Sequence, residues 1–443
     1  MLKIAALNQK KILSFFAFVP ILSLFPTIQL YSKPLQCDVP APIAILINAK
    51  TGKVLYEKNA QAPYFPASTT KVATALYALH KKPSGLNTTW TGVYETVGAV
   101  SPQARRMSGK HPSYRLEFGG THMGIKPGEI LDYKTLLYGL MLVSANDSAN
   151  MIAEMVSGSV PDFMKEMNAF LKEIGCTNTN FRNPHGLPDP HHYTTAHDMA
   201  KISRLAMQNS FFRDVVKTVR YTRPTTNKQE ESNWLQFNAL LKKGKYYYPH
   251  AIGVKTGYTD HAGYNLVAAA EKGDRSLIAI ACYCDEVGKR YRSVINLFEA
   301  AFNEIKVSRK LFSKEHDLFH KTVLGAKQAL DAELSQDVII QYYPSEKSEY
   351  VSKVKWKEMS LPIYPGNEVG NVLIYDQEGV LQISMPLHAV REVSPSFGYQ
   401  CARFFEEGSL RLKEYRLYVG LLLGIMTLSF SFWHYKKRKR LPS

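Results

Sequence analysis

The sequence predicts an α/β fold with a small all-β domain and a C-terminal transmembrane helix. Strand-like runs stand at both ends of the region before residue 312, and amphipathic helical patterns occupy the stretch between them. After about residue 312 the pattern changes to short runs of alternating polar and apolar residues. Strands at both ends of a helical stretch suggest a layered structure whose sheet collects its N- and C-terminal strands.

The first expected elements are two strands and a helix. Residues 43–48 form a strand-like run, Ala49-Lys50-Thr51-Gly52 is a turn signal, and residues 53–56 return as a second strand. Two prolines precede a helix that starts near Ser68, where apolar residues repeat at helical spacing. Further helices are expected over residues 133–143, 146–155, 163–174, 196–207 and 294–302, and a hairpin is expected over residues 265–284.

Two stretches differ from the rest in composition. Residues 82–120 are rich in Gly, Pro and Ser and are expected to be irregular. Short alternating runs separated by turn signals predict a small all-β domain with no evident catalytic cluster. These runs cover residues 338–342, 350–356, 369–375 and 381–385.

The formal net charge of +17 first suggests a nucleic-acid partner. Residues 1–36 carry four Lys and no acidic residue, and residues 416–443 carry six Lys or Arg and no acidic residue. The two ends therefore supply 4 + 6 = 10 of the 17 charges, and the body between them is only mildly basic. Because the surplus lies at the ends, it indicates membrane topology, and no nucleic acid is expected as a partner.

The N-terminal end has the layout of an export signal. Lys3, Lys10 and Lys11 precede an uncharged, Phe- and Leu-rich run from residue 12 to residue 32. Pro20 and Pro26 would interrupt a clean spanning helix, which favours a cleaved signal over an uncleaved anchor. The C-terminal end predicts a transmembrane helix over residues 417–435, an uncharged run followed at once by a basic tail. Both ends place the body of the chain outside the cytoplasm.

The five cysteines give no disulfide framework, because their number is odd and their spacing is irregular. Cys282 and Cys284 alternate within one strand-like run, so they are expected on one face of that strand as buried free thiols. The sequence holds no cluster with metal-ligand spacing, and no metal or other cofactor is expected.

The chemistry begins with Ser68-Thr69-Thr70-Lys71, an S-x-x-K motif at a helix start. The i,i+3 spacing places both functional side chains on one helix face. A serine hydroxyl needs a base to become a nucleophile, and a lysine can be that base if desolvation or nearby cations lower its pKa. Alone the motif is weak, and a capping serine beside a surface lysine would explain it equally well.

Two further motifs follow in a specific order. Ser144-Ala145-Asn146 stands between two expected helices, and Lys255-Thr256-Gly257 is expected to open a strand. S-x-x-K, S-x-N and K-T-G in this order are typical of the penicillin-interacting serine acyl-transferases. Each motif could arise by chance, but the three in order, each in its expected element, make chance improbable.

The resemblance extends beyond the three motifs. Together with Asn183-Pro184-His185-Gly186-Leu187, they make residues 41–303 similar to the D-alanyl-D-alanine carboxypeptidases, the low-molecular-mass penicillin-binding proteins. Residues 361–389 resemble the small C-terminal β domain of that family. The resemblance implies a β-lactamase/transpeptidase-like sheet with a helical subdomain. Ala145 departs from the glycine more usual in the family, and residues 82–120 find no counterpart.

The resemblance also implies a role for each motif residue. Ser68 would be acylated by the carbonyl between the last two D-alanines, Lys71 would be its general base, and Ser144 would pass a proton to the leaving amine. Asn146 would hold the peptide, and Lys255, Thr256 and Gly257 would bind the substrate, with its terminal carboxylate on Lys255 and Thr256. The backbone N–H groups of Ser68 and Tyr258 would form the oxyanion hole.

Three other residues are candidates with an open alternative. His185 and Asp198 correspond to positions around the family's active-site loop, although a purely structural role explains them as well. Arg290 could contact a carboxylate or the sheet edge, and the alternative is a solvated surface arginine.

Four functions remain to be compared. The first is a carboxypeptidase that hydrolyses the terminal D-alanyl-D-alanine bond of peptidoglycan stem peptides and is acylated by β-lactam antibiotics. The second is a class A β-lactamase, which needs an E-x-x-L-N loop that is absent between Asp147 and Val254. The third is an endopeptidase that cuts peptidoglycan crosslinks, which the sequence does not separate from the first. The fourth is a non-catalytic penicillin sensor or scaffold, which would not require the complete motif set.

The sequence thus predicts an exported protein anchored in the cytoplasmic membrane, with its catalytic domain on the outer, periplasmic side. The expected parts are a signal sequence at 1–36, the catalytic domain at 37–308, the β domain at 309–392, a linker at 393–416, the transmembrane helix at 417–435 and a basic cytoplasmic tail at 436–443.

Overall fold

The computed structural model describes residues 27–29, 35–107, 111–346, 349–376 and 379–438. The chain forms two compact units. The larger unit comprises Tyr31–Val307 with Tyr342–Lys347, and the smaller unit comprises Met1–Leu30, Ser308–Gln341 and Ser348–Ser443.

The larger unit is built on a five-stranded antiparallel sheet in the order β10-β11-β12-β2-β3. Its strands are β2 (Ile43–Asn48), β3 (Val54–Lys58), β10 (Ala251–Thr259), β11 (Gly263–Lys272) and β12 (Arg275–Cys284). β2 lies beside β12 although more than 200 residues separate them in the chain, and β3 pairs with β2 at the edge of the sheet. This is the predicted collection of N- and C-terminal strands into one sheet.

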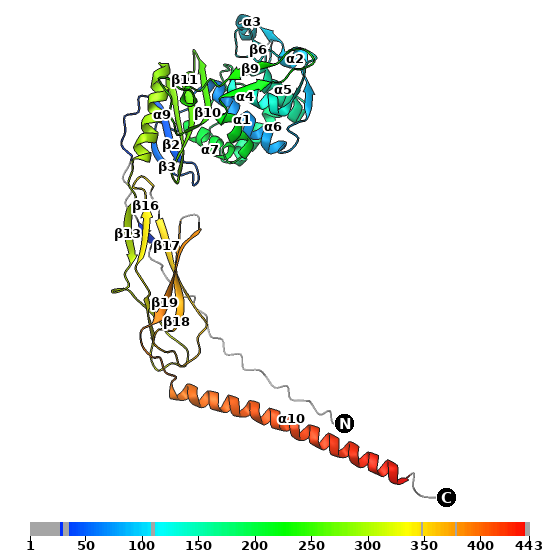
Figure 1. Ribbon diagram of the computed structural model, residues 1–443, viewed down its shortest axis with the longest axis vertical. Coiled ribbons are helices and arrows are strands. Elements are labelled where there is room, and N and C mark those ends of the chain that lie inside the picture. Colours follow the sequence, from blue (N-terminus) through cyan, green and yellow to red (C-terminus); the bar gives the residue numbers. More distant parts are fainter. Residues whose placement is uncertain (1–26, 30–34, 108–110, 347–348, 377–378, 439–443) are drawn as a thin grey trace, which may run out of the picture. The chain divides into compact units, whose positions relative to one another are not determined.

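Helices cover both faces of this sheet (Figure 1). They are α1 (Thr70–Lys81), α4 (Tyr133–Leu142), α5 (Asn146–Ser157), α6 (Val160–Glu173), α7 (Ala196–Ala206), α8 (Ser210–Lys217) and α9 (Val287–Phe302). On one face, Leu266 of β11 packs with Leu297 and Phe298 of α9. On the other face, Ile45 and Ile280 join a larger core with the helices α1 and α4 to α8. The two faces are both buried because side chains alternate along each strand.

Shorter elements connect the helices to the sheet. Residues 82–120, which were expected to be irregular, form only brief elements before α4. These elements are β4 (Thr89–Thr91), α2 (Tyr94–Val97), β5 (Ala99–Val100), α3 (Pro102–Arg106) and β6 (Leu116–Glu117). The strand β7 (Ile130–Asp132) follows them. Around the motifs lie η1 (Ala67–Thr69), β8 (Arg220–Arg223), β9 (Ser232–Leu235) and η2 (Ala239–Leu241).

The end of β12 corrects the prediction for the cysteines. Cys282 packs in the core on the α1 side of the sheet, whereas Cys284 packs on the α9 side. Tyr283 between them has a positive φ of 60°, and the β11–β12 register shifts between Tyr264 and Leu266. This irregularity breaks the two-residue alternation, so the two thiols lie on opposite faces; both are buried and free.

A buried arginine holds the segment Tyr342–Lys347 to the rest of the larger unit. Arg275, at the start of β12, pairs with Glu304 at 3.1 Å and with Glu346 at 2.8 Å. Its guanidinium also lies 3.9 Å from the centre of the Tyr343 ring, and Glu304 accepts hydrogen bonds from both the backbone and the hydroxyl of Ser345. A segment distant in sequence is thus part of the larger unit's structure.

The smaller unit contains a six-stranded sheet, a two-stranded sheet and a long helix. The six-stranded order is β1-β17-β18-β19-β15-β14, and β13 pairs with β16. The elements are β1 (Thr27–Gln29), β13 (Val307–Phe312), β14 (Leu318–Lys321), β15 (Leu330–Leu334), β16 (Val338–Tyr342), β17 (Glu349–Trp356), β18 (Glu368–Tyr375), β19 (Leu381–Ala389) and α10 (Phe397–Arg438). The four alternating runs noted in the sequence correspond to β16 to β19.

The predicted transmembrane helix is wrong. The run at 417–435 belongs to α10, but no helix among the residues described here is both long enough and apolar enough to cross a membrane.

Parts of the other terminal predictions fall outside the described residues. Residues 1–26 and 30–34 of the predicted signal sequence do so, as do residues 439–443 of the predicted basic tail. The described part of the predicted signal includes Thr27–Gln29, which form β1 and pair with β17.

Candidate active site

Ser68 and Lys71 lie on one turn at the junction of η1 and α1. The Nζ atom of Lys71 is 3.0 Å from Oγ of Ser68. The turn is tight: Ala67 has a positive φ of 49°, and a Cβ on Gly186 would lie 1.8 Å from the Ala67 carbonyl oxygen. Gly186 is therefore required where the 183–192 loop passes the nucleophile, and its own φ of 92° also favours glycine.

Lys71 is fully buried and contacts three oxygen atoms. Besides Ser68, its Nζ donates to Oδ1 of Asn146 and to the backbone carbonyl of His185, both at 2.7 Å. An amide or peptide carbonyl oxygen can only accept a hydrogen bond, so a neutral Lys71 amine would use its two N–H groups there. Its lone pair would then face the Ser68 hydroxyl, as a general base requires.

The electrostatics favour that neutral form. Burial lowers the pKa of Lys71 well below its usual range, and the nearby charge of Lys255 lowers it further, while Asp147 acts in the opposite direction. Desolvation penalises the charged amine, and no ionised side chain among the described residues contacts it directly. Lys71 is thus arranged to take a proton from Ser68.

The S-x-N motif forms the turn between α4 and the start of α5. Ser144 has a positive φ of 62°, which turns the chain between the two helices. The backbone N–H of Asn146 donates to the carbonyl of Thr121 at 2.8 Å. Asp147 accepts hydrogen bonds from the backbone N–H groups of residues 123 to 125, so the start of α5 is tied to the 121–125 loop. No role was predicted for Asp147 from the sequence, although its place directly after S-x-N was a usable signal.

The K-T-G motif lies in the second half of β10 rather than at the start of a strand, which corrects that expectation. Lys255 is buried, and its Nζ donates to the backbone carbonyl of Thr256 at 2.9 Å. Burial and the charge of Arg290 lower the pKa of Lys255 to about 7. A Cβ on Gly257 would lie 2.9 Å from the carbonyl oxygen of Pro66 and 3.1 Å from the backbone N of Ser68. Glycine therefore lets β10 approach the nucleophile closely.

Arg290 of α9 lies beside this strand and is buried, so the alternative of a solvated surface arginine does not hold. Its Nη1 is 3.3 Å from the carbonyl oxygens of both Gly257 and Asn265. It has no acidic ion-pair partner among the described residues. A buried, unpaired cation at the wall of a cleft is suited to an anionic ligand.

These residues meet in one cleft of about 690 Å³. Its lining includes Ser68, Ser144, Asn146, Thr256, Gly257, Tyr258 and Arg290. It also includes residues 117 to 121, so part of the segment 82–120 reaches the site, which the sequence had left open. Tyr258 has an exposed ring, and its hydroxyl donates to Asp260, which also lines the cleft.

His185 and Asp198 have different positions. The carbonyl of His185 accepts from Lys71, while its ring lies between the Tyr114 carbonyl and the Leu187 N–H. Its burial lowers the pKa of the ring well below the usual range, so the imidazole is neutral. Asp198 accepts from the backbone of Asn178 and the hydroxyl of Thr179, away from the cleft. The structure thus gives Asp198 a structural role.

Comparison with known proteins agrees with this geometry. Residues 29–284 match the family described as D-alanyl-D-alanine carboxypeptidase. The D-alanyl-D-alanine carboxypeptidase DacF of Bacillus subtilis is 31% identical over 358 residues, which cover 80% of this chain and 86% of that protein.

Two solved structures show the same fold. A D-alanyl-D-alanine carboxypeptidase from Mycobacterium tuberculosis is 31% identical with a TM-score of 0.52, covering 62% of this chain and 95% of its own. The D-alanyl-D-alanine carboxypeptidase DacD from Francisella tularensis, at 22% identity and a TM-score of 0.55, covers 83% of this chain and 97% of its own and supports the fold alone. The chain therefore belongs to the D-alanyl-D-alanine carboxypeptidase family of serine peptidases, the low-molecular-mass penicillin-binding proteins.

Proposed function

We propose that this protein removes the terminal D-alanine from peptidoglycan stem peptides through an acyl-enzyme on Ser68. The observation that carries the proposal is the contact between the buried Lys71 amine and the Ser68 hydroxyl at 3.0 Å. It places a base with a lowered pKa on a nucleophile at the floor of a cleft.

In the acylation step, each proton that moves and each bond that forms or breaks involves a named group. Ser68 Oγ attacks the carbonyl carbon of the penultimate D-alanine while Lys71 takes its proton. The backbone N–H groups of Ser68 and Tyr258 would hold the developing oxyanion. Ser144, in the same cleft, would pass a proton to the amine of the departing D-alanine as the C–N bond breaks, and would regain it from Lys71, which returns to its neutral form. Water then attacks the ester while Lys71 takes its proton. That proton passes to the Ser68 oxygen as the ester C–O bond breaks, which releases the shortened peptide and restores Ser68.

The substrate's terminal carboxylate would bind beside Lys255 and Thr256 of β10 and Arg290 of α9. Lys255 and Arg290 supply positive charge there, and Thr256 supplies a hydroxyl. A penicillin carries a carboxylate next to a reactive amide carbonyl, so it would occupy the same positions and acylate Ser68.

Hydrolysis of D-alanyl-D-alanine and labelling by penicillin can be tested on the same protein. We expect release of D-alanine from a stem pentapeptide and covalent labelling by a fluorescent penicillin, with both lost in Ser68→Ala. A matched control is Ser210→Ala at the exposed start of α8. Labelling that survives in Ser68→Ala would refute the nucleophile, and penicillin turnover without D-alanine release would favour the β-lactamase. Faster cleavage of D-alanine-bearing crosslinks than of pentapeptides would favour the endopeptidase.

We also propose that the protein acts outside the cytoplasmic membrane. Two arguments support this: the stem peptide is located there, and residues 1–36 have the charge and apolarity layout of an export signal. Protease accessibility of the chain in spheroplasts tests the location. The mass of the mature protein tests cleavage, because removal of residues 1–36 would also remove β1 from the six-stranded sheet.

A further inference from the structure

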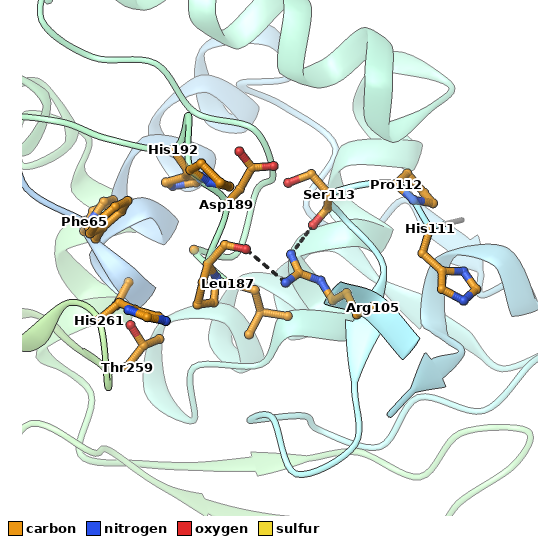
Figure 2. A pocket seen from close by; sticks show the side chains of 15 residues that line it. Phe65, Arg105, His111, Pro112, Ser113, Leu187, Asp189, His192, Thr259 and His261 are labelled. Atoms are coloured by element: carbon orange, nitrogen blue, oxygen red, sulfur yellow. Dashed lines mark hydrogen bonds between the residues drawn. The ribbon is translucent and has the colours of Figure 1, made fainter. Parts of the chain in front are cut away.

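A second cavity, of about 540 Å³, adjoins the catalytic cleft. Gly186, Leu187 and Thr259 line both spaces, so the two are continuous along the end of β10. Figure 2 shows Phe65, Thr259 and His261 on one side of this cavity. Arg105, His111 and Ser113 lie on the other side, and Leu187 and Asp189 stand between the two sides. None of the residues proposed to bind the terminal carboxylate lines it.

The direction of the substrate leads into this cavity. β10 is the edge strand of its sheet, and an extended peptide can add to such an edge by backbone hydrogen bonds. With the carboxylate at Thr256 and the scissile carbonyl at Ser68, next to Gly257, the peptide runs antiparallel to β10 toward Thr259. Each residue advances about 3.4 Å, so the residue preceding the two D-alanines comes level with Tyr258 and Thr259.

Two of the polar groups that line the cavity are already satisfied. Arg105 pairs with Glu117 at 3.0 Å and donates to the carbonyl of Pro188 at 3.0 Å. His192 is buried, with one ring nitrogen 2.9 Å from the hydroxyl of Thr70. Burial lowers the pKa of His192 to about 3, so its ring is uncharged at neutral pH. Neither residue leaves a free charge for a ligand.

Asp189 is different, because no lysine or arginine pairs with it among the described residues. Partial burial raises the pKa of its carboxyl, but hydrogen bonds from the backbone of His191 and the hydroxyl of Ser113, with the nearby charge of Arg182, hold that pKa below its usual range. The carboxyl is half-buried and ionised. It gives the cavity an anionic side chain without a direct cationic partner.

We propose that this cavity binds the protonated side-chain amine of the diamino acid that precedes the two D-alanines, with Asp189 as its counter-charge. The proposal rests on the carboxypeptidase function above and adds the chemical identity of the residue recognised upstream of the scissile bond. When that amine is acylated in a crosslink, it loses its charge. The cavity therefore favours uncrosslinked stem peptides over crosslinked ones.

The test compares pentapeptides that differ only at this amine. The kcat/KM for D-alanine release is measured with a free amine and with the same amine acetylated, in peptides containing lysine and in peptides containing diaminopimelate. We expect the wild-type protein to prefer the free amine by about tenfold or more in both series, which is the fold change of one hydrogen bond between charged groups. This first comparison needs no variant.

The second arm assigns the preference to Asp189. Asp189→Asn keeps an oxygen that can accept hydrogen bonds from Ser113 and His191 but loses the charge. We therefore expect the free and the acetylated form of each peptide to have equal kcat/KM values. Asp162→Asn, at the exposed start of α6, is the matched control and should keep the preference. Thermal denaturation checks that both variants are folded.

The failures are distinguishable. Absence of D-alanine release from every peptide would overturn the carboxypeptidase function and this inference with it. Release without a preference in the wild-type protein would overturn only the amine site. A preference that persists in Asp189→Asn would overturn the counter-charge, and one confined to a single diamino acid would overturn the ammonium as the recognised group.

Discussion

Lys255 of β10 and Lys71 of α1 are buried in the same site, and the charge of Lys255 lowers the pKa of the Lys71 amine. The pKa of Lys255 is itself lowered to about 7 by burial and by Arg290. The three basic groups are therefore coupled in sequence: Arg290 lowers the pKa of Lys255, and Lys255 lowers the pKa of Lys71.

Replacement of Lys255 by methionine should shift the pH dependence of acylation: the rise of the rate constant on the acidic side, the acidic limb, should occur at higher pH. The base acts in its neutral form, above its pKa, and loss of a neighbouring positive charge raises that pKa. The rate constant for labelling by a fluorescent penicillin, measured against pH, reports the limb. The maximum rate constant for labelling should also fall, because the carboxylate of the penicillin loses a partner. Lys165→Met, exposed on α6, should leave the limb in place; an unmoved limb in Lys255→Met would contradict the coupling.

Replacement of Lys255 by arginine should remove a decline on the alkaline side. In the wild-type protein, kcat/KM for D-alanine release should fall as pH rises through about 7, because Lys255 loses the charge that attracts the substrate carboxylate. An arginine keeps its charge throughout this range. The pH profile of the variant should therefore be flat there, at a lower absolute rate. The same decline in both proteins would assign the alkaline limb to another group.

Gly257→Ala should damage catalysis by displacing the nucleophile. The added Cβ would meet the carbonyl of Pro66 at 2.9 Å and the backbone N of Ser68 at 3.1 Å, and those backbone atoms cannot yield as a flexible side chain can. A misplacement on the order of 1 Å costs about 100-fold in rate, so kcat/KM should fall by roughly that factor. Gly398→Ala in α10, where a Cβ meets open space, is the control. Unchanged activity in Gly257→Ala would show that the close approach is not needed.

Arg275→Met should destabilise the larger unit by about 3–5 kcal/mol, because it leaves Glu304 and Glu346 without their shared cation. Urea denaturation gives the change in the free energy of unfolding. The exposed pair of Lys81 and Glu166 provides a comparison: Lys81→Met should cost less than about 1 kcal/mol. Similar losses in the two variants would contradict a special role for the buried cluster.

Much of the fold could be predicted from local pattern. The apolar run of β2, the alternation in β17 to β19, and the helical repeats of α1 and α4 to α7 set these elements close to their observed bounds. The catalytic pair was predictable for a simple reason: Ser68 and Lys71 are three residues apart, and one helical turn brings them together. Asn146, distant in sequence, was found only because its motif is ordered relative to the others.

What the sequence did not reveal depends on backbone irregularity and on burial. Tyr283 adopts a positive φ that no local pattern indicates, and it sends Cys284 to the other face of the sheet. Arg290 is polar and lies on a helix, so only the tertiary structure shows that it faces the cleft. The uncharged run at 417–435 suggested a membrane span, but absence of charge is a weaker condition than apolarity over the whole length.

The contacts of Arg275 affect where this protein can be truncated. Composition changes after about residue 312, which makes a truncation there an obvious choice for crystallography or for a minimal soluble enzyme. Such a fragment would end before Tyr342–Lys347, strip Glu346 and Tyr343 from Arg275, and leave a polar surface where the segment had covered it. A minimal fragment should therefore keep the chain through Lys347, or carry this six-residue segment on a short artificial linker after Val307.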